Sequence, residues 1–111
     1  MEKDEFYRLH ADICKAISSP IRQAILEIIG DREVSVTELM ERTGISQSNI
    51  SQHLAKLRGN DVVSTRREGN NIYYSISNPK ILEAYNLISE VLQQILLSKN
   101  KIVSDAAENN K

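Results

Sequence analysis

Residues 46–58 read SQSNISQHLAKLR, and this segment decides the fold that the sequence predicts. Its apolar residues Ile50, Leu54 and Leu57 recur at helical spacing, which is the pattern of a helix that packs one narrow stripe on a small core. The other face carries uncharged polar side chains where a solvated helix usually carries Glu, Lys and Arg. These side chains are Gln47, Ser48, Asn49, Ser51, Gln52 and His53. Asn, Gln and Ser hydrogen-bond base edges in the DNA major groove, so we interpret the segment as a DNA-reading helix, with an ordinary polar surface helix as the alternative.

The residues before this segment predict a shorter helix and a tight turn. Ser35 and Glu38 have the spacing of a capping box, which marks the start of a helix. Gly44 suits the left-handed position that ends a helix, and Ser46 is a good N-cap for the next one. Two helices joined by a tight turn with Gly predict a helix-turn-helix, whose second helix is the recognition helix.

After the recognition helix the apolar pattern changes from helical to alternating. Residues 63–67 and 72–76 are rich in β-branched and aromatic side chains. Between them Gly69, Asn70 and Asn71 tolerate positive φ, so the sequence predicts a β-hairpin. A hairpin in this position is the wing of a winged helix. Arg66 and Arg67 near its tip are expected to reach phosphates or the minor groove, with ordinary solubilising charges as the alternative.

Three further helices complete the predicted fold. One covers residues 4–17, a second begins at Pro20 and ends at Gly30, and a long last helix begins at Pro79 after the N-cap Asn78. The predicted fold class is mainly α with a small β-hairpin, in the order α-α-α-α-β-β-α, with a very short strand before the third helix as an option. We expect one domain over residues 1–103 and a frayed or disordered tail over residues 104–111.

The last helix has more apolar surface than a small domain covers. A heptad-like seam runs along it, and further apolar residues widen the apolar surface beyond one stripe. The seam consists of Ile81, Tyr85, Ile88, Leu92 and Ile95. The simplest cover for such a helix is its own domain on one side and a twin chain on the other, so we expect a homodimer. Packing wholly within the monomer is the alternative.

Composition and charge indicate an ordinary globular domain. Of 111 residues, 41% are hydrophobic and 26% charged, which suits one core, and the net charge of −1 does not by itself indicate nucleic acid. Residues 46–75 nevertheless carry four basic side chains against two acidic ones, whereas residues 1–12 carry four acidic against two basic. With no export signal and no run of eighteen apolar residues, we expect a cytoplasmic protein.

Few residues could carry catalysis or bind a metal. Cys14, the single cysteine, lies in an apolar helical pattern and is expected to be a buried thiol, with redox sensing or an intersubunit disulfide as alternatives. The sequence has no Gly-rich phosphate loop and no paired Cys or His at metal spacing, and neither His10 nor His53 has an evident nucleophile partner. We therefore expect no enzymatic activity, no cofactor and no metal site.

The order of these motifs resembles the ArsR/SmtB family of dimeric winged-helix repressors. The resemblance covers residues 5–98 and is most specific over residues 46–57 and 66–74. It implies base and backbone contacts from the recognition helix, further contacts from the wing, and a dimer built from the first and last helices. With the polar face and Lys56 included, the candidate DNA-contact residues are Gln47, Ser48, Asn49, Ser51, Gln52, His53, Lys56, Arg66, Arg67 and Asn70. The candidate dimer-interface residues are Leu9, Ile13, Tyr85, Ile88, Leu92 and Ile95.

The sequence departs from this family at its metal sites. Members that sense thiophilic metals carry a Cys motif at the start of the third helix, and residues 33–37 contain no Cys. The positions that match the family's zinc ligands in the last helix are Asn78, Lys80, Val91 and Gln94. We therefore expect a repressor that binds near-palindromic double-stranded DNA without these metal sites and with an unknown inducer. A winged-helix protein-interaction module and a redox-responsive repressor using Cys14 are the alternatives.

Overall fold

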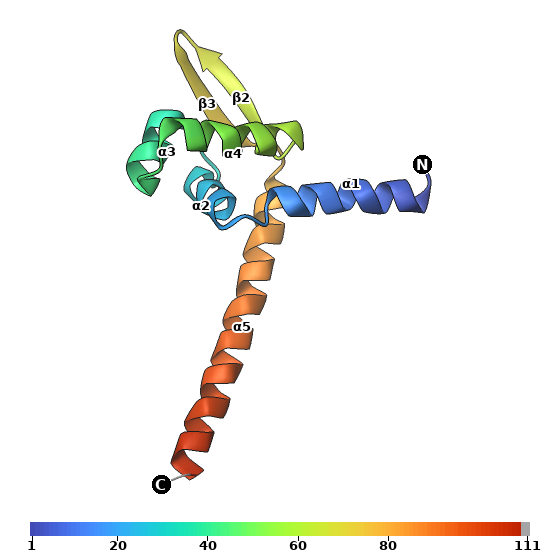
Figure 1. The fold of residues 1–111 in the computed structure, drawn as a ribbon, viewed down its shortest axis with the longest axis vertical. Helices are drawn as coiled ribbons and strands as arrows, with labels where there is room; N and C mark the ends of the chain where they lie inside the picture. The colour runs from blue at the N-terminus through green and yellow to red at the C-terminus, as the bar shows by residue number, and fades with distance from the viewer. Residues whose placement is uncertain (110–111) are drawn as a thin grey trace. The chain divides into compact units, whose positions relative to one another are not determined.

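The computed structural model describes the backbone of residues 1–109 and the side chains of residues 1–101. The described part forms the predicted order of elements, with a two-residue strand before the third helix (Figure 1). The elements are α1 (Lys3–Ala16), α2 (Pro20–Ile29), β1 (Val34–Ser35), α3 (Val36–Thr43), α4 (Gln47–Gly59), β2 (Val63–Glu68), β3 (Asn71–Ile76) and α5 (Pro79–Asn109). Two compact units result: Met1–Ile81 contains the winged helix, and the second begins at Leu82 and consists of the rest of α5.

The helix starts follow the capping residues that the sequence predicts. The Ser19, Ser35 and Ser46 hydroxyls each accept a hydrogen bond from the backbone amide three residues later, at 3.2–3.4 Å. Gly44 has a φ of 72° and ends α3 in the left-handed conformation. Only half of the predicted capping box forms, because the Glu38 carboxylate binds the Arg32 guanidinium at 2.8 Å instead.

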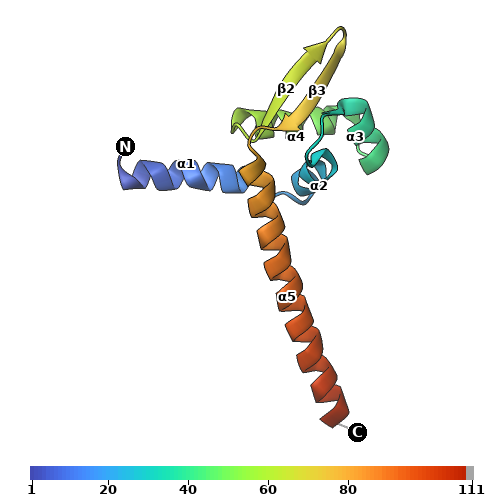
Figure 2. The same cartoon turned by 180° about the vertical axis from the view of Figure 1, so that it is seen from behind.

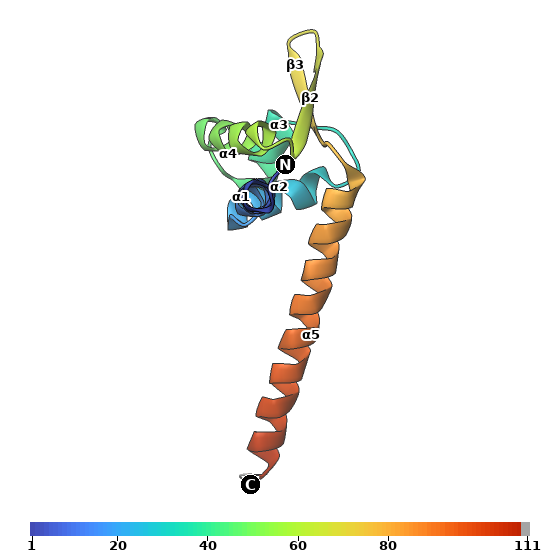
Figure 3. The same ribbon diagram turned by 90° about the vertical axis from the view of Figure 1, so that its right-hand side faces the viewer.

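The core of the Met1–Ile81 unit lies between α2, α3, α4 and the sheet. Ile50, Leu54 and Leu57, the predicted stripe of α4, are at most 1% exposed. They meet buried residues of α2, α3, β1 and the segment that enters β2, which are Ile25, Leu26, Ile29, Leu39, Val34, Val62 and Val63. Figure 3 shows α3 and α4 packed together with the hairpin of β2 and β3 standing above them. Helix α4 is therefore fixed by its apolar side, and its polar side faces away from the core.

The sheet has the order β1-β3-β2, and both pairings are antiparallel. Val34 pairs with Tyr74, and Tyr74 pairs in turn with Thr65. At the wing tip Gly69 has a φ of 61°, whereas Asn70 and Asn71 keep negative φ, so only one of the three predicted turn residues uses the left-handed region. Helix α4 continues to Gly59, and Asn60 Nδ2 donates to the Lys56 carbonyl at 2.9 Å, so the turn into β2 begins only at Asn60.

The two terminal helices leave apolar side chains exposed in the single chain. Figure 2 shows α1 projecting from α2–α4, and Ala16 at its C-terminal end is its buried residue. Cys14 is exposed, so the prediction of a buried thiol is wrong for the single chain, because no other part of the Met1–Ile81 unit covers that face of α1. Helix α5 continues past Val103 to Asn109 through residues that include good helix formers, without Gly or Pro. Residues 110–111 of the predicted tail lie outside the described residues, and fraying of this end stays a prediction. None of the described helices combines the length and hydropathy needed to cross a membrane.

Candidate nucleic-acid interface

Helix α4 presents most of its predicted polar residues to solvent. Gln47, Ser48, Ser51 and Gln52 are all exposed, on the sides of the helix away from the buried stripe. Ser48 Oγ lies 3.3 Å from Ser46 Oγ, and within the described residues the side chains of Gln47, Ser51 and Gln52 have no hydrogen-bond partner. Their amide and hydroxyl groups are thus available to an external partner. Ala55, which the sequence analysis does not select, is exposed one turn beyond Ser51. Its small side chain leaves room for a partner to approach this face closely.

His53 differs from the rest of the predicted polar face. It is half-buried, and its Nδ1 atom is buried without a hydrogen-bond partner among the described residues. Burial, together with the positive charges of Arg22 and Lys56, lowers the pKa of His53 below its ordinary value of 6.5. His53 is three residues after Ile50 and four before Leu57, so it lies next to the buried stripe of α4. Its side chain is therefore directed toward α2, which partly buries it. The structure therefore separates His53 from the exposed reading face.

The wing holds its two arginines on opposite faces. Successive side chains of a strand alternate, and Arg66 pairs with Tyr73 while Arg67 pairs with Ile72. Arg66 is engaged: its guanidinium contacts Glu33 at 2.7 Å and Glu68 at 2.9 Å. Arg67 is exposed and has no ion-pair partner among the described residues, and Asn70, in the turn between β2 and β3, is also exposed. Of the two predicted arginine contacts, Arg67 alone has an unengaged charge.

The sequence patterns do not predict a role for Glu33. No local pattern links this residue to Arg66, which lies thirty-three residues later in the chain. The contact follows from sheet order, because β1 and β2 flank β3 and only folding brings Glu33 near Arg66. A basic residue in the wing and an acidic residue before the third helix are the only sequence signal.

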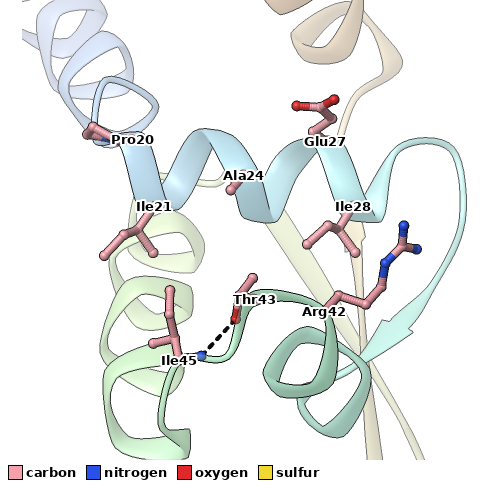
Figure 4. Close-up of a pocket in the computed structure, with 8 residues that line it drawn as sticks. All are labelled: Pro20, Ile21, Ala24, Glu27, Ile28, Arg42, Thr43 and Ile45. Carbon is pink, nitrogen blue, oxygen red and sulfur yellow. Dashed lines mark hydrogen bonds between the residues drawn. The ribbon is translucent and has the colours of Figure 1, made fainter.

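An open hollow of about 520 Å³ lies between α2, the end of α3 and the turn before α4. Figure 4 shows Ile21, Ala24 and Ile28 of α2 facing it, with Arg42 and Glu27 at the rim. Thr43 Oγ1 accepts a hydrogen bond from the Ile45 amide at 3.2 Å, which holds the turn closed. The hollow is lined by one acidic and one basic side chain, and its single hydroxyl, Thr43 Oγ1, also donates to the Leu39 carbonyl at 2.6 Å. In the part of the chain that the structure describes, no three Cys, His, Asp or Glu side chains gather where they could bind a metal ion.

Comparisons with known proteins agree with this geometry. The family model described as "Bacterial regulatory protein, arsR family" matches residues 19–65. A Mycobacterium tuberculosis protein described as an uncharacterized HTH-type transcriptional regulator, Rv0081, is 38% identical over 106 residues, which covers 95% of this chain and 93% of that protein. Its crystal structure aligns with a TM-score of 0.79 and covers 89% of this chain and 98% of that one.

Two further relatives carry more specific descriptions. The transcriptional repressor PagR of Bacillus anthracis is 35% identical over 82 residues, which covers 73% of this chain and 82% of PagR. A solution structure from Mycobacterium bovis, described as a homodimeric winged helix-turn-helix DNA-binding domain, is 26% identical with a TM-score of 0.79. That alignment covers 85% of this chain and 87% of the other.

Proposed function

Because this chain belongs to the ArsR family of DNA-binding transcriptional regulators, we propose that it is a homodimeric repressor that binds near-palindromic double-stranded DNA. The observation that carries the proposal is the contrast between the two sides of α4. One side is at most 1% exposed, and the other presents amide and hydroxyl groups that lack partners among the described residues. Such a helix is held rigidly by the fold and can enter a major groove with its donors and acceptors unoccupied.

The residues of α4 divide into two roles in this proposal. Gln47 and Gln52 reach base edges, because a side-chain amide can donate and accept at once, and Ser48 and Ser51 hydrogen-bond bases or phosphates. Asn49 and Lys56 lie to one side of this face and contact the DNA backbone. A face built to dock a protein would more often expose aromatic, Met or Leu side chains, so the exposed residues favour DNA over a protein-interaction module.

The wing adds affinity that does not depend on sequence. Arg67 carries an unengaged charge on an exposed hairpin, and Asn70 sits at the tip with its amide exposed. We assign both to phosphate or minor-groove contacts beside the major-groove site. The net charge of the chain does not argue against DNA binding, because only the basic groups on the face that meets DNA contribute to these contacts.

The homodimer follows from the uncovered apolar side chains. Leu9 and Ile13 of α1 are 47% and 44% exposed, and Ile88, Leu92 and Ile95 of α5 are 70%, 53% and 45% exposed. A second copy covers these faces with the same residues, as a two-fold interface requires. Two recognition helices would then lie one DNA turn apart, about 34 to 36 Å, which is why the proposed operator is near-palindromic. A regulator of this kind acts in the cytoplasm, where bacterial DNA lies.

A gel-shift titration tests the proposal. The protein is added to DNA from the region upstream of its own gene, with excess non-specific competitor, and to a scrambled DNA of equal length. We expect a single dimer-sized complex with the upstream DNA, and a reporter driven by that DNA should fall when the protein is expressed. Equal binding to both DNAs contradicts sequence-specific recognition, and a reporter that rises contradicts repression.

A further inference from the structure

One face of the three-stranded sheet carries a contact that spans all its strands. Arg66 of β2 extends across β3, with its guanidinium carbon 5.0 Å from the centre of the Tyr73 ring. Beyond that ring it meets Glu33, the residue before β1: Nε donates to the two carboxylate oxygens at 3.0 and 3.1 Å, and Nη2 donates at 2.7 Å. A side chain of β2 that bonds the residue immediately before β1 links the two edges of the sheet across β3.

The opposite face of the wing is the one that meets the recognition helix. Val63, Thr65 and Arg67 alternate with Ser64 and Arg66, and Tyr74 shares the face of Thr65. Val63 is buried in the core and Tyr74 packs against it, and Tyr74 also lines a hollow with Ser51 and Ala55 of α4. Arg67 therefore belongs to the face of the hairpin that lies toward α4, and Arg66 belongs to the face turned away from it.

The contact between Arg66 and Glu33 also connects the wing to the helix-turn-helix. Glu33 lies two residues before Ser35, the N-cap of α3, so a bond from the wing to Glu33 ties the wing to the start of that motif. Both groups are charged near neutral pH, since the Arg66 guanidinium lowers the pKa of Glu33 and the carboxylates of Glu33 and Glu68 raise the pKa of Arg66. Two or more hydrogen bonds between planar groups also fix orientation better than a single contact does.

We propose that Arg66 and Glu33 form a positioning clamp that sets the angle of the wing against the helix-turn-helix, and that Arg67 makes the wing's phosphate contact. This inference rests on the proposed DNA-binding function. In this assignment Arg66 is a positioning residue and stays on Glu33 when DNA binds. The simpler alternative is that both arginines contact DNA and that Glu33 merely competes with phosphate for Arg66.

Replacement of Glu33 separates these two accounts by the sign of its effect. If Glu33 competes with DNA, Glu33→Gln frees Arg66, removes a negative charge and tightens binding. If the clamp positions the wing, Glu33→Gln weakens binding to the upstream DNA about 2- to 5-fold, the range of an exposed ion pair. The matched control is Glu68→Gln, which removes an equal charge bonded to Arg66 but on the same strand, so it should not weaken binding.

Salt dependence provides a second measurement on the arginines themselves. Arg67→Gln should lower the slope of log K against log salt by about one, because a phosphate contact is lost, whereas Arg66→Gln should leave the slope unchanged. An exchange of the pair, Glu33→Arg with Arg66→Glu, is made in the Glu68→Gln background, because the Glu68 carboxylate would repel the introduced acid. Because the added positive charge would itself favour DNA binding, this triple variant is compared with the same protein without Glu33→Arg by amide hydrogen exchange in the absence of DNA. Its β2 and β3 amides should exchange more slowly if the reversed pair restores the clamp. Tighter binding by Glu33→Gln, or a lower slope for Arg66→Gln, overturns the clamp.

A measurement without DNA keeps the clamp distinguishable from the proposed function. Amide hydrogen exchange of β2 and β3 should become faster in Glu33→Gln than in Glu68→Gln, while the amides of α2 and α4 keep wild-type rates. If the wild-type protein binds no DNA, the proposed function fails, and the exchange rates alone decide whether the clamp holds the wing. Equal rates in the two variants contradict the clamp.

Discussion

Helices α4 and α5 carry similar apolar patterns but differ in burial within the single chain. The stripe of α4 is at most 1% exposed, whereas Ile88 and Leu92 in the seam of α5 are 70% and 53% exposed. Both patterns predict burial, so the difference lies in what surrounds each helix within its own unit. The stripe of α4 is covered by other elements of the Met1–Ile81 unit, whereas the unit that begins at Leu82 contains no second element to cover the seam of α5. The reading element is thus rigid in each copy, while its spacing from a second reading element depends on association.

The largest effect should come from a charge placed in the α5 seam. Leu92→Asp would bury an unpaired carboxylate in the proposed interface, at a cost of about 3 to 5 kcal/mol, which raises the dimer Kd by more than about 100-fold. Sedimentation should show monomers at concentrations where the wild type is a dimer. Gln93→Asp is the control, because it adds the same charge one residue away and off the seam. A wild type that is monomeric at micromolar concentration contradicts the proposed role of α5.

The next effect should appear on the exposed side of α4. Gln52→Ala should cost about 1 to 3 kcal/mol of discrimination at one base position and leave thermal unfolding unchanged, because Gln52 contributes nothing to the core. Competition between operator and scrambled DNA measures the first quantity and calorimetry the second. The same change at Gln94 of α5 should alter neither. If Gln52→Ala keeps its full preference for the operator, α4 does not read that base.

Local sequence signals predicted most of the fold, and long-range contacts account for what they did not predict. Capping residues and helical spacing place α3 and α4 within a residue or two, since those signals act over three or four positions. The direction of His53 and the pairing of Arg66 with Glu33 depend on α2 and on sheet order, which no window of neighbouring residues contains. The exposure of Cys14 was mispredicted because an apolar helical pattern does not say which chain covers it.

A smaller effect concerns the pH dependence of thermal stability, to which the half-buried His53 should contribute. The folded pKa of His53 lies below 6.5, so the unfolded chain binds more protons than the folded one as the pH falls below that value, and stability falls with it. We expect the melting temperature of the wild type to drop more than that of His53→Gln between about pH 7 and about pH 5.5. His10→Gln removes the other histidine from an exposed position on α1 and is the control. Equal drops in wild type and His53→Gln would show that burial of His53 does not affect stability.

The smallest expected effect concerns metals and the uncovered face of α1. A tight Zn²⁺ site needs about three or four ligands within about 2.0 to 2.3 Å of the ion. On α1 the His10 Nδ1 and Cys14 Sγ atoms lie 3.6 Å apart and supply two ligands, so a four-ligand site would require the same pair from a second copy. Dimerisation through the α5 seam and the first helices would have to bring the two His10–Cys14 pairs together. Carboxylates near the acidic N-terminus do not by themselves complete such a metal site. We expect micromolar Zn²⁺, Cd²⁺ or arsenite to change operator affinity by less than about twofold, or under about 0.5 kcal/mol. Titration of each ion into the protein–DNA complex under reducing conditions measures this. DNA release at stoichiometric metal that Cys14→Ser abolishes would instead show that association builds a sensor on the face that the single chain leaves open.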